Sequence, residues 1–163
     1  MDALTRAVLD AVLECHGNGT KQVVDCDTTK ERFERPQDPK AIERSWDFFN
    51  YTLPGLRRDT FDDFEQNNKE SVDAQEVLGD HPELLFRSIK DVLAGGWDGF
   101  KEAYPESFGT MEISRPGVST DHRQALICIG DHHEVWGVGK YYLCESDGAE
   151  WRVIDKCTAW RAD

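Results

Sequence analysis

The spacing of apolar residues changes near Gly109, and this change constrains the fold more than any other feature of the chain. Before this point, large apolar side chains recur every three or four residues, as on one face of a helix. After it, they recur at every second residue, as on one face of a strand, and short polar turns separate the runs. Because such short turns make neighbouring strands run antiparallel, the sequence predicts an α+β fold, with N-terminal helices packed on a C-terminal antiparallel β-meander.

The N-terminal part predicts a helical layer with one early strand. Each expected helix has apolar residues at helical spacing between capping and breaking residues. The expected helices run over residues 3–15, from Asp38 to Leu53, from Thr60 to Asn67, from Asp80 to Gly95 and over residues 97–104. Val23 and Val24 predict a short strand from Gln22 to Asp27 that could join the sheet.

The C-terminal part predicts about four strands, near residues 111–114, 124–129, 135–144 and 151–160. Asp147-Gly148 is typical of a hairpin turn, and a turn centred there places Tyr142 opposite Val153. Gly137 and Gly139 lie on one face of the third strand. Because glycine weakens a strand interior, the pair predicts a bend or the close approach of a Trp side chain or backbone. The alternative is the floor of a ligand groove.

The size of the chain indicates a single domain, residues 1–163, with 1–108 mainly helical and 109–163 mainly sheet. Hydrophobic residues make up 39% of the sequence, which is enough to expect a packed core. No apolar stretch approaches the roughly 18 residues needed to cross a bilayer. Asp2, Arg6, Asp10 and Glu14 interrupt the N-terminus, unlike a signal peptide. These patterns predict a soluble cytoplasmic protein, with a leader removed from the natural chain as the alternative.

The formal net charge of −13 argues against binding to nucleic acid or to an anionic membrane through a basic surface. The charge is uneven: the segment from Asp59 to Asp80 holds eight acids and one base, a net charge of −7. Such a segment permits a basic protein partner, although solubility is the simpler interpretation. The sequence does not indicate an oligomeric state.

The five cysteines are odd in number and form no CxxC motif, so neither a zinc site nor a thioredoxin-like motif is expected. Reduced thiols are the expectation for a chain of this length, which does not need disulfides for stability. The predicted hairpin register places Cys157 opposite Val138 and therefore predicts no disulfide there. Cys15 and Cys26 flank a glycine-rich loop and are the pair that an oxidising compartment could bridge.

Motifs for catalysis and for metal binding are absent from the sequence, which contains no HExxH, GxSxG, P-loop or GxGxxG pattern. The polar segment Asp131-His132-His133-Glu134 is expected to be an exposed turn, far along its strand from His122. Asp25-Cys26-Asp27-Thr28 lacks the later ligands of a calcium loop, and a strand-end turn is favoured over a magnesium or catalytic role. No catalytic residue, metal or cofactor is therefore predicted.

The C-terminal third carries a set of short motifs that resembles small bacterial proteins of unknown function. The motifs are Tyr104-Pro105-Glu106-Ser107-Phe108-Gly109, Ser114-Arg115-Pro116-Gly117-Val118-Ser119, Gln124-Ala125-Leu126 and Gly137-Val138-Gly139-Lys140-Tyr141-Tyr142-Leu143, followed by Gly148, Trp151 and Trp160. Residues 23–28 are similar to an early strand of the same proteins. The resemblance implies the β-meander and implies no activity.

Two functions follow as hypotheses. The first is a non-catalytic interaction protein, like an immunity protein or inhibitor, that binds a basic protein. The residues expected to contact such a partner are Asp59, Asp62, Asp63, Glu65, Trp136 and Trp160. The second is a small-molecule binder or enzyme with a pocket between helices and a curved sheet, by analogy with NTF2-like folds. The residues expected to line such a pocket are Asp25, Asp27, Tyr141 and Tyr142.

Overall fold

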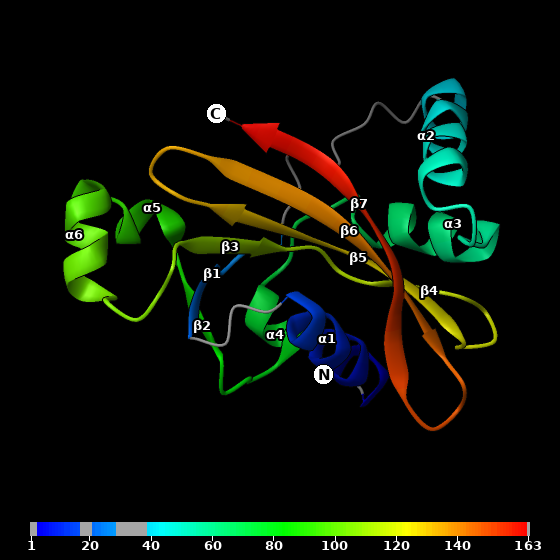
Figure 1. The fold of residues 1–163 in the computed structure, drawn as a ribbon, viewed down its shortest axis with the longest axis horizontal. Coiled ribbons are helices and arrows are strands. Elements are labelled where there is room, and N and C mark those ends of the chain that lie inside the picture. Colours follow the sequence, from blue (N-terminus) through cyan, green and yellow to red (C-terminus); the bar gives the residue numbers. More distant parts are fainter. Residues whose placement is uncertain (1–2, 17–20, 29–38, 163) are drawn as a thin grey trace.

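The computed structural model describes residues 3–16, 21–28 and 39–162 (Figure 1). The helices in these ranges are α1 (Ala3–His16), α2 (Pro39–Thr52), α3 (Arg58–Asn67), α4 (Ala74–Leu78), α5 (Ile89–Val92) and α6 (Gly96–Ala103). The strands are β1 (Gln22–Asp25), β2 (Leu84–Arg87), β3 (Thr110–Ile113), β4 (Gly117–Val118), β5 (Gln124–His132), β6 (Gly137–Ser146) and β7 (Trp151–Ala162). None of these helices combines the length and the apolar character that a bilayer span requires.

One mixed sheet of seven strands joins both parts of the chain. Its order is β2-β1-β3-β5-β6-β7, and β4 pairs with β5. Strand β1 runs parallel to β2 and β3, whereas the remaining pairs are antiparallel. The α+β class, the antiparallel C-terminal strands and the early strand are therefore confirmed. The sheet is wider than predicted, because β2 and β4 add to it.

The predicted helix from Asp80 to Gly95 is wrong in its first half, which forms strand β2. Leu84 and Phe86 are buried while Arg87 is exposed, so this segment alternates with a period of two. Its parallel pairing with β1 supplies the backbone partners that local spacing cannot reveal. Within the predicted helix, α5 is the helical part. The Ser88 hydroxyl caps α5 by accepting a hydrogen bond from the Asp91 N–H.

The start of α3 also differs from the prediction, because Thr60 lies inside the helix and does not cap it. The capping position is Arg57, whose side chain makes no capping hydrogen bond. Instead, the side-chain oxygen of Gln124 accepts hydrogen bonds from the Arg57 N–H at 2.7 Å and from the Thr60 hydroxyl at 3.1 Å. A residue on β5 thus takes the place of the local cap. The other predicted cap, Asp38, lies outside the described residues.

The β6–β7 hairpin has a different register from the predicted one. Its loop spans 147–150, because the Asp147 carboxylate accepts hydrogen bonds from the N–H groups of Ala149 and Glu150. A register shift between Leu143 and Cys144 adds to this change. As a result Tyr142 lies opposite Lys156 and not Val153.

The longer loop and this one shift also place Cys157 opposite Tyr141 and not Val138. The expectation that no disulfide crosses this hairpin is nevertheless confirmed, because all five cysteines, including Cys15 and Cys26, are free thiols.

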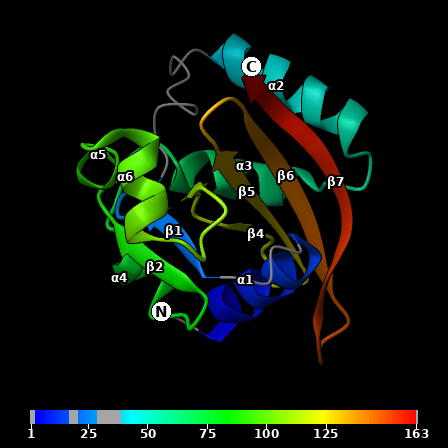
Figure 2. The ribbon, with the colours of Figure 1, turned by 60° about the vertical axis from the view of Figure 1, so that its left-hand side comes forward.

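Helices cover both faces of the sheet, whereas the sequence predicted a single helical layer (Figures 1 and 2). Helices α1 and α4 pack on one face, here called the α1 face. Its core is formed by Val8, Leu9, Val12, Val24, Ala74, Leu78, Leu84, Phe86, Met111, Ile113, Ala125, Ile127, Ile129, Tyr142 and Cys144.

Helices α2 and α3 pack on the opposite α2 face. The core there is formed by Phe49, Leu53, Leu56, Phe61, Phe64, Leu126, Cys128, Tyr141 and Leu143. Strand β5 is buried without interruption from Gln124 to Asp131, as expected for a strand covered on both sides. It therefore separates the two cores.

Trp160 lies flat against three glycines of β5 and β6. A Cβ atom would lie 2.9 Å from its ring at Gly130 and 3.0 Å at Gly137, and would overlap the indole nitrogen at Gly139. The register shift beside Gly139 brings Trp160 opposite this glycine. The close approach of a tryptophan, predicted from the glycine pair, is confirmed.

We expect Gly139→Ala to destabilise the protein by about 1–3 kcal/mol, because the added methyl group overpacks the Trp160 ring. Urea unfolding measures the change in the free energy of unfolding. In a Trp160→Ala background the same substitution should cost much less, since the two residues interact directly. Gly99→Ala is the control, because a Cβ there meets no atom within 4 Å. Equal costs of Gly139→Ala in the two backgrounds would contradict the packing described.

Candidate functional site

An exposed aromatic patch lies at the turn between β5 and β6, and consists of Phe108, His133, Val135 and Trp136. Phe108 is 64% exposed, Val135 73% and Trp136 41%. The His133 ring lies between the rings of Phe108 and Trp136. Its centroid is 4.3 Å from that of Phe108 and 3.9 Å from that of Trp136. Large apolar side chains that gather on the surface in this way are typical of contact sites.

Strand pairing brings the parts of the patch together. Thr110 at the start of β3 lies opposite His132 at the end of β5, so the residues just before β3 meet the β5–β6 turn. The His133 ring nitrogen Nδ1 lies 2.8 Å from the Phe108 carbonyl oxygen and donates a hydrogen bond to it. Gly109 permits this approach, because a Cβ there would overlap the His132 carbonyl oxygen.

The turn itself is also fixed by hydrogen bonds. The His133 N–H donates to the Trp136 carbonyl oxygen at 2.8 Å, which closes the turn. On the outside, Lys101 of α6 donates to the Glu134 carboxylate at 2.6 Å. The patch is therefore held in one arrangement before any partner binds, which lowers the entropy cost of binding.

A recess of 410 Å³ opens beside the patch. Its lining residues are His132, His133, Glu134, Val135, Trp136, Gly137 and Ala162. The His132 ring stacks on Trp160 with centroids 5.1 Å apart, and its Nε2 lies 3.2 Å from a Glu112 carboxylate oxygen. Aromatic rings and carboxylates together suit a cationic group, which ring faces and negative charges both attract.

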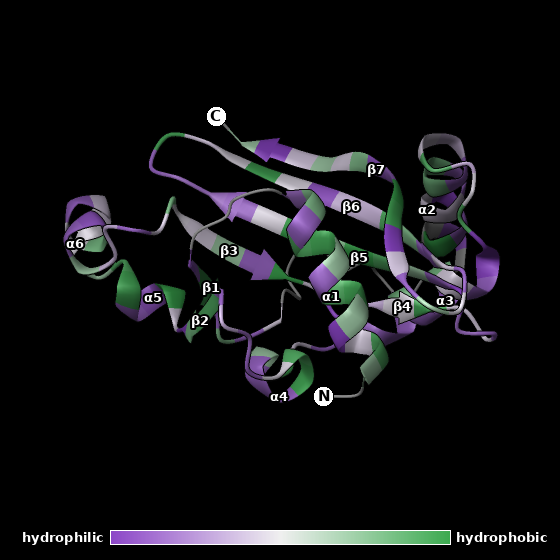
Figure 3. Cartoon of the chain, turned by 60° about the horizontal axis from the view of Figure 1, so that its bottom comes forward, coloured by the Kyte–Doolittle hydropathy of each residue, from purple (hydrophilic) through white to green (hydrophobic). Residues whose placement is uncertain are grey.

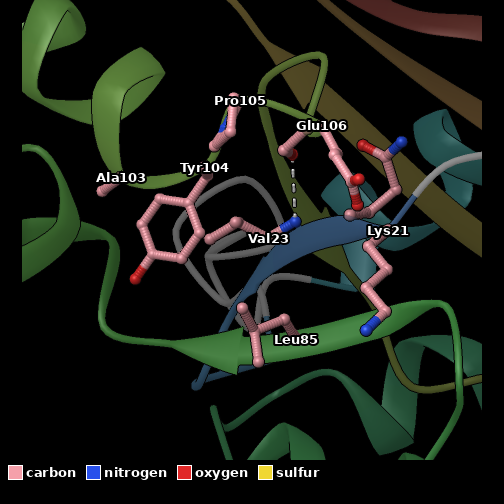
Figure 4. Close-up of a pocket in the computed structure, with 9 residues that line it drawn as sticks. Lys21, Val23, Leu85, Ala103, Tyr104, Pro105 and Glu106 are labelled. Carbon is pink, nitrogen blue, oxygen red and sulfur yellow. Dashed lines mark hydrogen bonds between the residues drawn. The ribbon is translucent and has the colours of Figure 1, made fainter.

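A second cavity, of 310 Å³, lies over β1 and β2 (Figure 4). Its lining residues are Lys21, Gln22, Val23, Leu85, Ala103, Tyr104, Pro105, Glu106 and Ser107. The Val23 N–H donates to the Ser107 hydroxyl at 3.4 Å, and this hydroxyl donates to the Gly109 carbonyl oxygen at 2.8 Å. The segment 104–108 therefore has the cavity on one side and Phe108 of the aromatic patch at its end.

The residues predicted to line a pocket lie apart from both cavities. Tyr141 is buried in the core of the α2 face and Tyr142 in that of the α1 face, so they point to opposite sides of the sheet. Asp25 ends β1, and burial raises its pKa, although N–H groups of Asp27 and Ile89 lower it in part. Asp27 is exposed and pairs with Asp73 in an isolated bridge.

Two of the acids predicted to contact a partner fasten α3 to β4 and to the loop between β4 and β5. The Asp59 carboxylate accepts hydrogen bonds from the Thr120 N–H at 2.9 Å and from its hydroxyl at 2.8 Å. These bonds lower the pKa of Asp59. Asp63 accepts a hydrogen bond of 2.7 Å from the Val118 N–H. Both side chains therefore have a structural role.

The remaining predicted contact residues are divided between the two ends of the sheet. Asp62 pairs with Arg58 at 2.8 Å on the outside of α3, and Glu65 is half-buried on the same helix. Trp160 is half-buried on its glycines, so Trp136 is the more exposed of the two tryptophans. Figure 1 shows α3 and the β5–β6 turn at opposite ends of β5. The structure does not bring the predicted acids and Trp136 together.

A buried polar cluster that sequence reasoning missed joins α1 to the sheet. His16 Nδ1 lies 2.6 Å from the Tyr142 hydroxyl, and His16 Nε2 lies 3.0 Å from the Asp131 carboxylate. The exposed fraction of the His16 side chain is 3% and that of Asp131 is 11%. A cluster so enclosed anchors α1 and is closed to a substrate. No local pattern could reveal it, because its members are far apart in the sequence.

We expect Tyr142→Phe to destabilise the protein by about 1–3 kcal/mol, because it leaves a buried nitrogen of His16 without this partner. Burial, and then the charge of Asp131, raise the pKa of Tyr142. The folded state therefore favours the neutral hydroxyl, and this stabilisation is present below about pH 10 and lost as the pH rises further. Tyr51→Phe is the control, because Tyr51 is 87% exposed. Equal urea midpoints for both variants would contradict this role.

Comparisons with protein-family models, with curated proteins and with solved structures give no match for this chain. Function must therefore be argued from the site itself. The aromatic patch with its recess and the cavity over β1 and β2 are features of the described residues that a partner or ligand could occupy. In these residues no group of three or more His, Cys, Asp or Glu side chains is placed to hold a metal ion.

Proposed function

We propose that this protein is a non-catalytic recognition module that binds a basic protein partner through the aromatic patch, in the manner of an immunity protein or inhibitor. The observation that carries the proposal is the exposure of Val135 and Trp136 on a fixed turn together with Phe108, which the segment before β3 holds beside that turn. Aromatic anchors of this kind contribute a large share of the binding energy in protein interfaces.

The recess gives the patch a preference for positive charge. Glu134 is exposed at its rim, and Glu112 lies behind His132. An arginine or lysine of the partner would stack on Trp136 and exchange with Lys101 for the Glu134 carboxylate. Because the Lys101–Glu134 pair is exposed, replacing it costs little.

The net charge of −13 supports the same class of partner at longer range. Exposed charges act over about 8 Å at physiological ionic strength, so the acids of α3, at the far end of β5, do not contact a ligand at the patch. Their part in this proposal is to orient a basic protein as it approaches.

A small-molecule binder is the second candidate function, favoured by the cavity of 310 Å³ in Figure 4. Its walls include Val23, Leu85 and Pro105, with Lys21 and Glu106 as charged groups. The volume is near the lower end of the range for ligand pockets, about 300–1,000 Å³. A short-chain carboxylic acid fits this chemistry, with its carboxylate near Lys21.

Selection of a random displayed peptide library against the immobilised protein tests the first function. We expect selected peptides to combine arginine or lysine with an apolar residue. The Phe108→Ser/Trp136→Ser variant should weaken their binding at least about thirtyfold, the loss of one strong anchor. The control is Phe48→Ser/Tyr51→Ser, which removes an exposed aromatic pair from α2. Peptides without cationic residues, or equal losses in both variants, would reject the proposal.

A thermal-shift screen with short-chain carboxylic acids tests the second function. Acids that stabilise the wild-type protein should fail to stabilise Leu85→Trp, because the larger side chain fills the cavity. Phe48→Ser, on α2 and outside the cavity lining, should respond as the wild type does. The candidate is rejected when no acid stabilises the wild-type protein or when Leu85→Trp responds equally.

A further inference from the structure

We infer that the recess beside the aromatic patch holds a cationic ligand at neutral pH and releases it in mild acid, because His132 and His133 become positively charged there. The inference rests on the proposed function and deepens it, since it adds control by pH to the same site. The two histidines belong to the polar segment Asp131-His132-His133-Glu134, which the sequence predicts as an exposed turn. Its last three residues line the recess.

The end of β5 brings both histidines to the recess. Neighbouring residues of a strand normally point to opposite faces, and Asp131 does lie on the α1 face, where it contacts His16. However, β5 ends at His132 and the chain turns at His133, so both rings line the recess together. In Figure 3 the chain is purple, for hydrophilic residues, where β5 ends, and it becomes green within the β5–β6 turn. A ligand in the recess therefore meets two imidazole rings.

Charged groups on three elements face these rings. Glu112 of β3 lies 3.2 Å from the Nε2 atom of His132, and Glu134 follows in the turn. Lys101 of α6 pairs with Glu134 at 2.6 Å and interacts electrostatically with Asp98 of the same helix. Among the described residues, the rings that contact the two histidines are neutral aromatic side chains, namely those of Trp160, Phe108 and Trp136.

Protonation reverses the charge of the recess. While both histidines are neutral, the carboxylates of Glu112 and Glu134 outnumber the ammonium group of Lys101, and the recess attracts a cation. Histidine is the side chain whose charge changes between about pH 5 and pH 8. Two imidazolium rings make the recess net positive, and a protonated His132 also pairs with Glu112, which then attracts the ligand less. A cationic ligand is therefore attracted at neutral pH and repelled in acid.

The shape of the patch does not depend on this change of charge. The Phe108 carbonyl oxygen can only accept a hydrogen bond, so the Nδ1 atom of His133 carries a hydrogen already in the neutral ring. Acid adds its proton at Nε2 and leaves the hydrogen bond of 2.8 Å intact. The aromatic anchors thus stay in place, and only the attraction for the charged group of the ligand is lost.

Fluorescence anisotropy with a labelled, acetylated peptide of alternating arginine and leucine tests this inference. The peptide keeps its charge in mild acid, because arginine stays protonated. The wild-type protein should bind it at least about tenfold more weakly at about pH 5.5 than at about pH 7.5, because two charges are added near the ligand. The loss should shrink as salt is added.

The recess variant, His132→Gln/His133→Asn, replaces both rings with neutral amides that reach the same hydrogen-bonding positions. Its affinities at the two pH values should agree within about twofold, because Asp and Glu side chains usually titrate below this range. A general effect of acid on folding or on the peptide would persist in this variant. His132→Gln alone leaves the rings of the patch in place and should show a smaller loss in acid than the wild type.

The control is His122→Asn, which removes an exposed histidine from the loop between β4 and β5, at the other end of β5. Asn tolerates the φ of 56° at this position. This variant should keep the dependence on pH of the wild type.

The inference is overturned if the wild type binds the peptide equally at both pH values, or if the recess variant loses as much affinity in acid as the wild type. It is also overturned if His122→Asn abolishes the dependence on pH. When the peptide binds at neutral pH and the Phe108→Ser/Trp136→Ser variant weakens this binding, such a result leaves the proposed function standing. A wild-type protein that does not bind the peptide at neutral pH contradicts both.

Discussion

The burial of β5 on both faces is the constraint on which the rest of the structure depends. Every residue from Gln124 to Asp131 is buried, so the sheet needs cover on each side. Helices α1 and α4 supply it on one face, and α2 and α3 on the other. Gln124 at one end replaces the cap of α3, and Asp131 at the other anchors α1 through His16. Thus one strand holds both helical layers and presents the β5–β6 turn at its end.

Local patterns were sufficient for the antiparallel strands, since the spacing of two and the Asp147-Gly148 turn are properties of neighbouring residues. They failed where a partner distant in sequence decides the structure. Leu84–Arg87 forms a strand because β1 offers a parallel edge, and Thr60 is buried because Gln124 takes the capping role. The hairpin register changed because Asp147 binds two N–H groups of a longer loop.

The candidate site was only partly visible in the sequence for the same reason. The sequence predicts Trp136 as a contact residue, and the structure places it in the aromatic patch. The sequence does not predict Phe108 and Val135 as contact residues, because the patch forms only when β3 pairs with the end of β5. The acids of α3 gave the strongest sequence signal, yet Asp59 and Asp63 bind backbone groups of the same chain. A charge pattern alone does not distinguish a steering surface from a structural contact.

The central claim is that the aromatic patch is the surface that a basic partner contacts. Hydrogen–deuterium exchange of the protein with and without a bound basic peptide tests it most directly, because the measurement reports on every segment at once. The account predicts slower exchange in residues 104–110 and 131–137, with little change in α3. Protection confined to α3, or to β1 and β2 around the cavity, would contradict it.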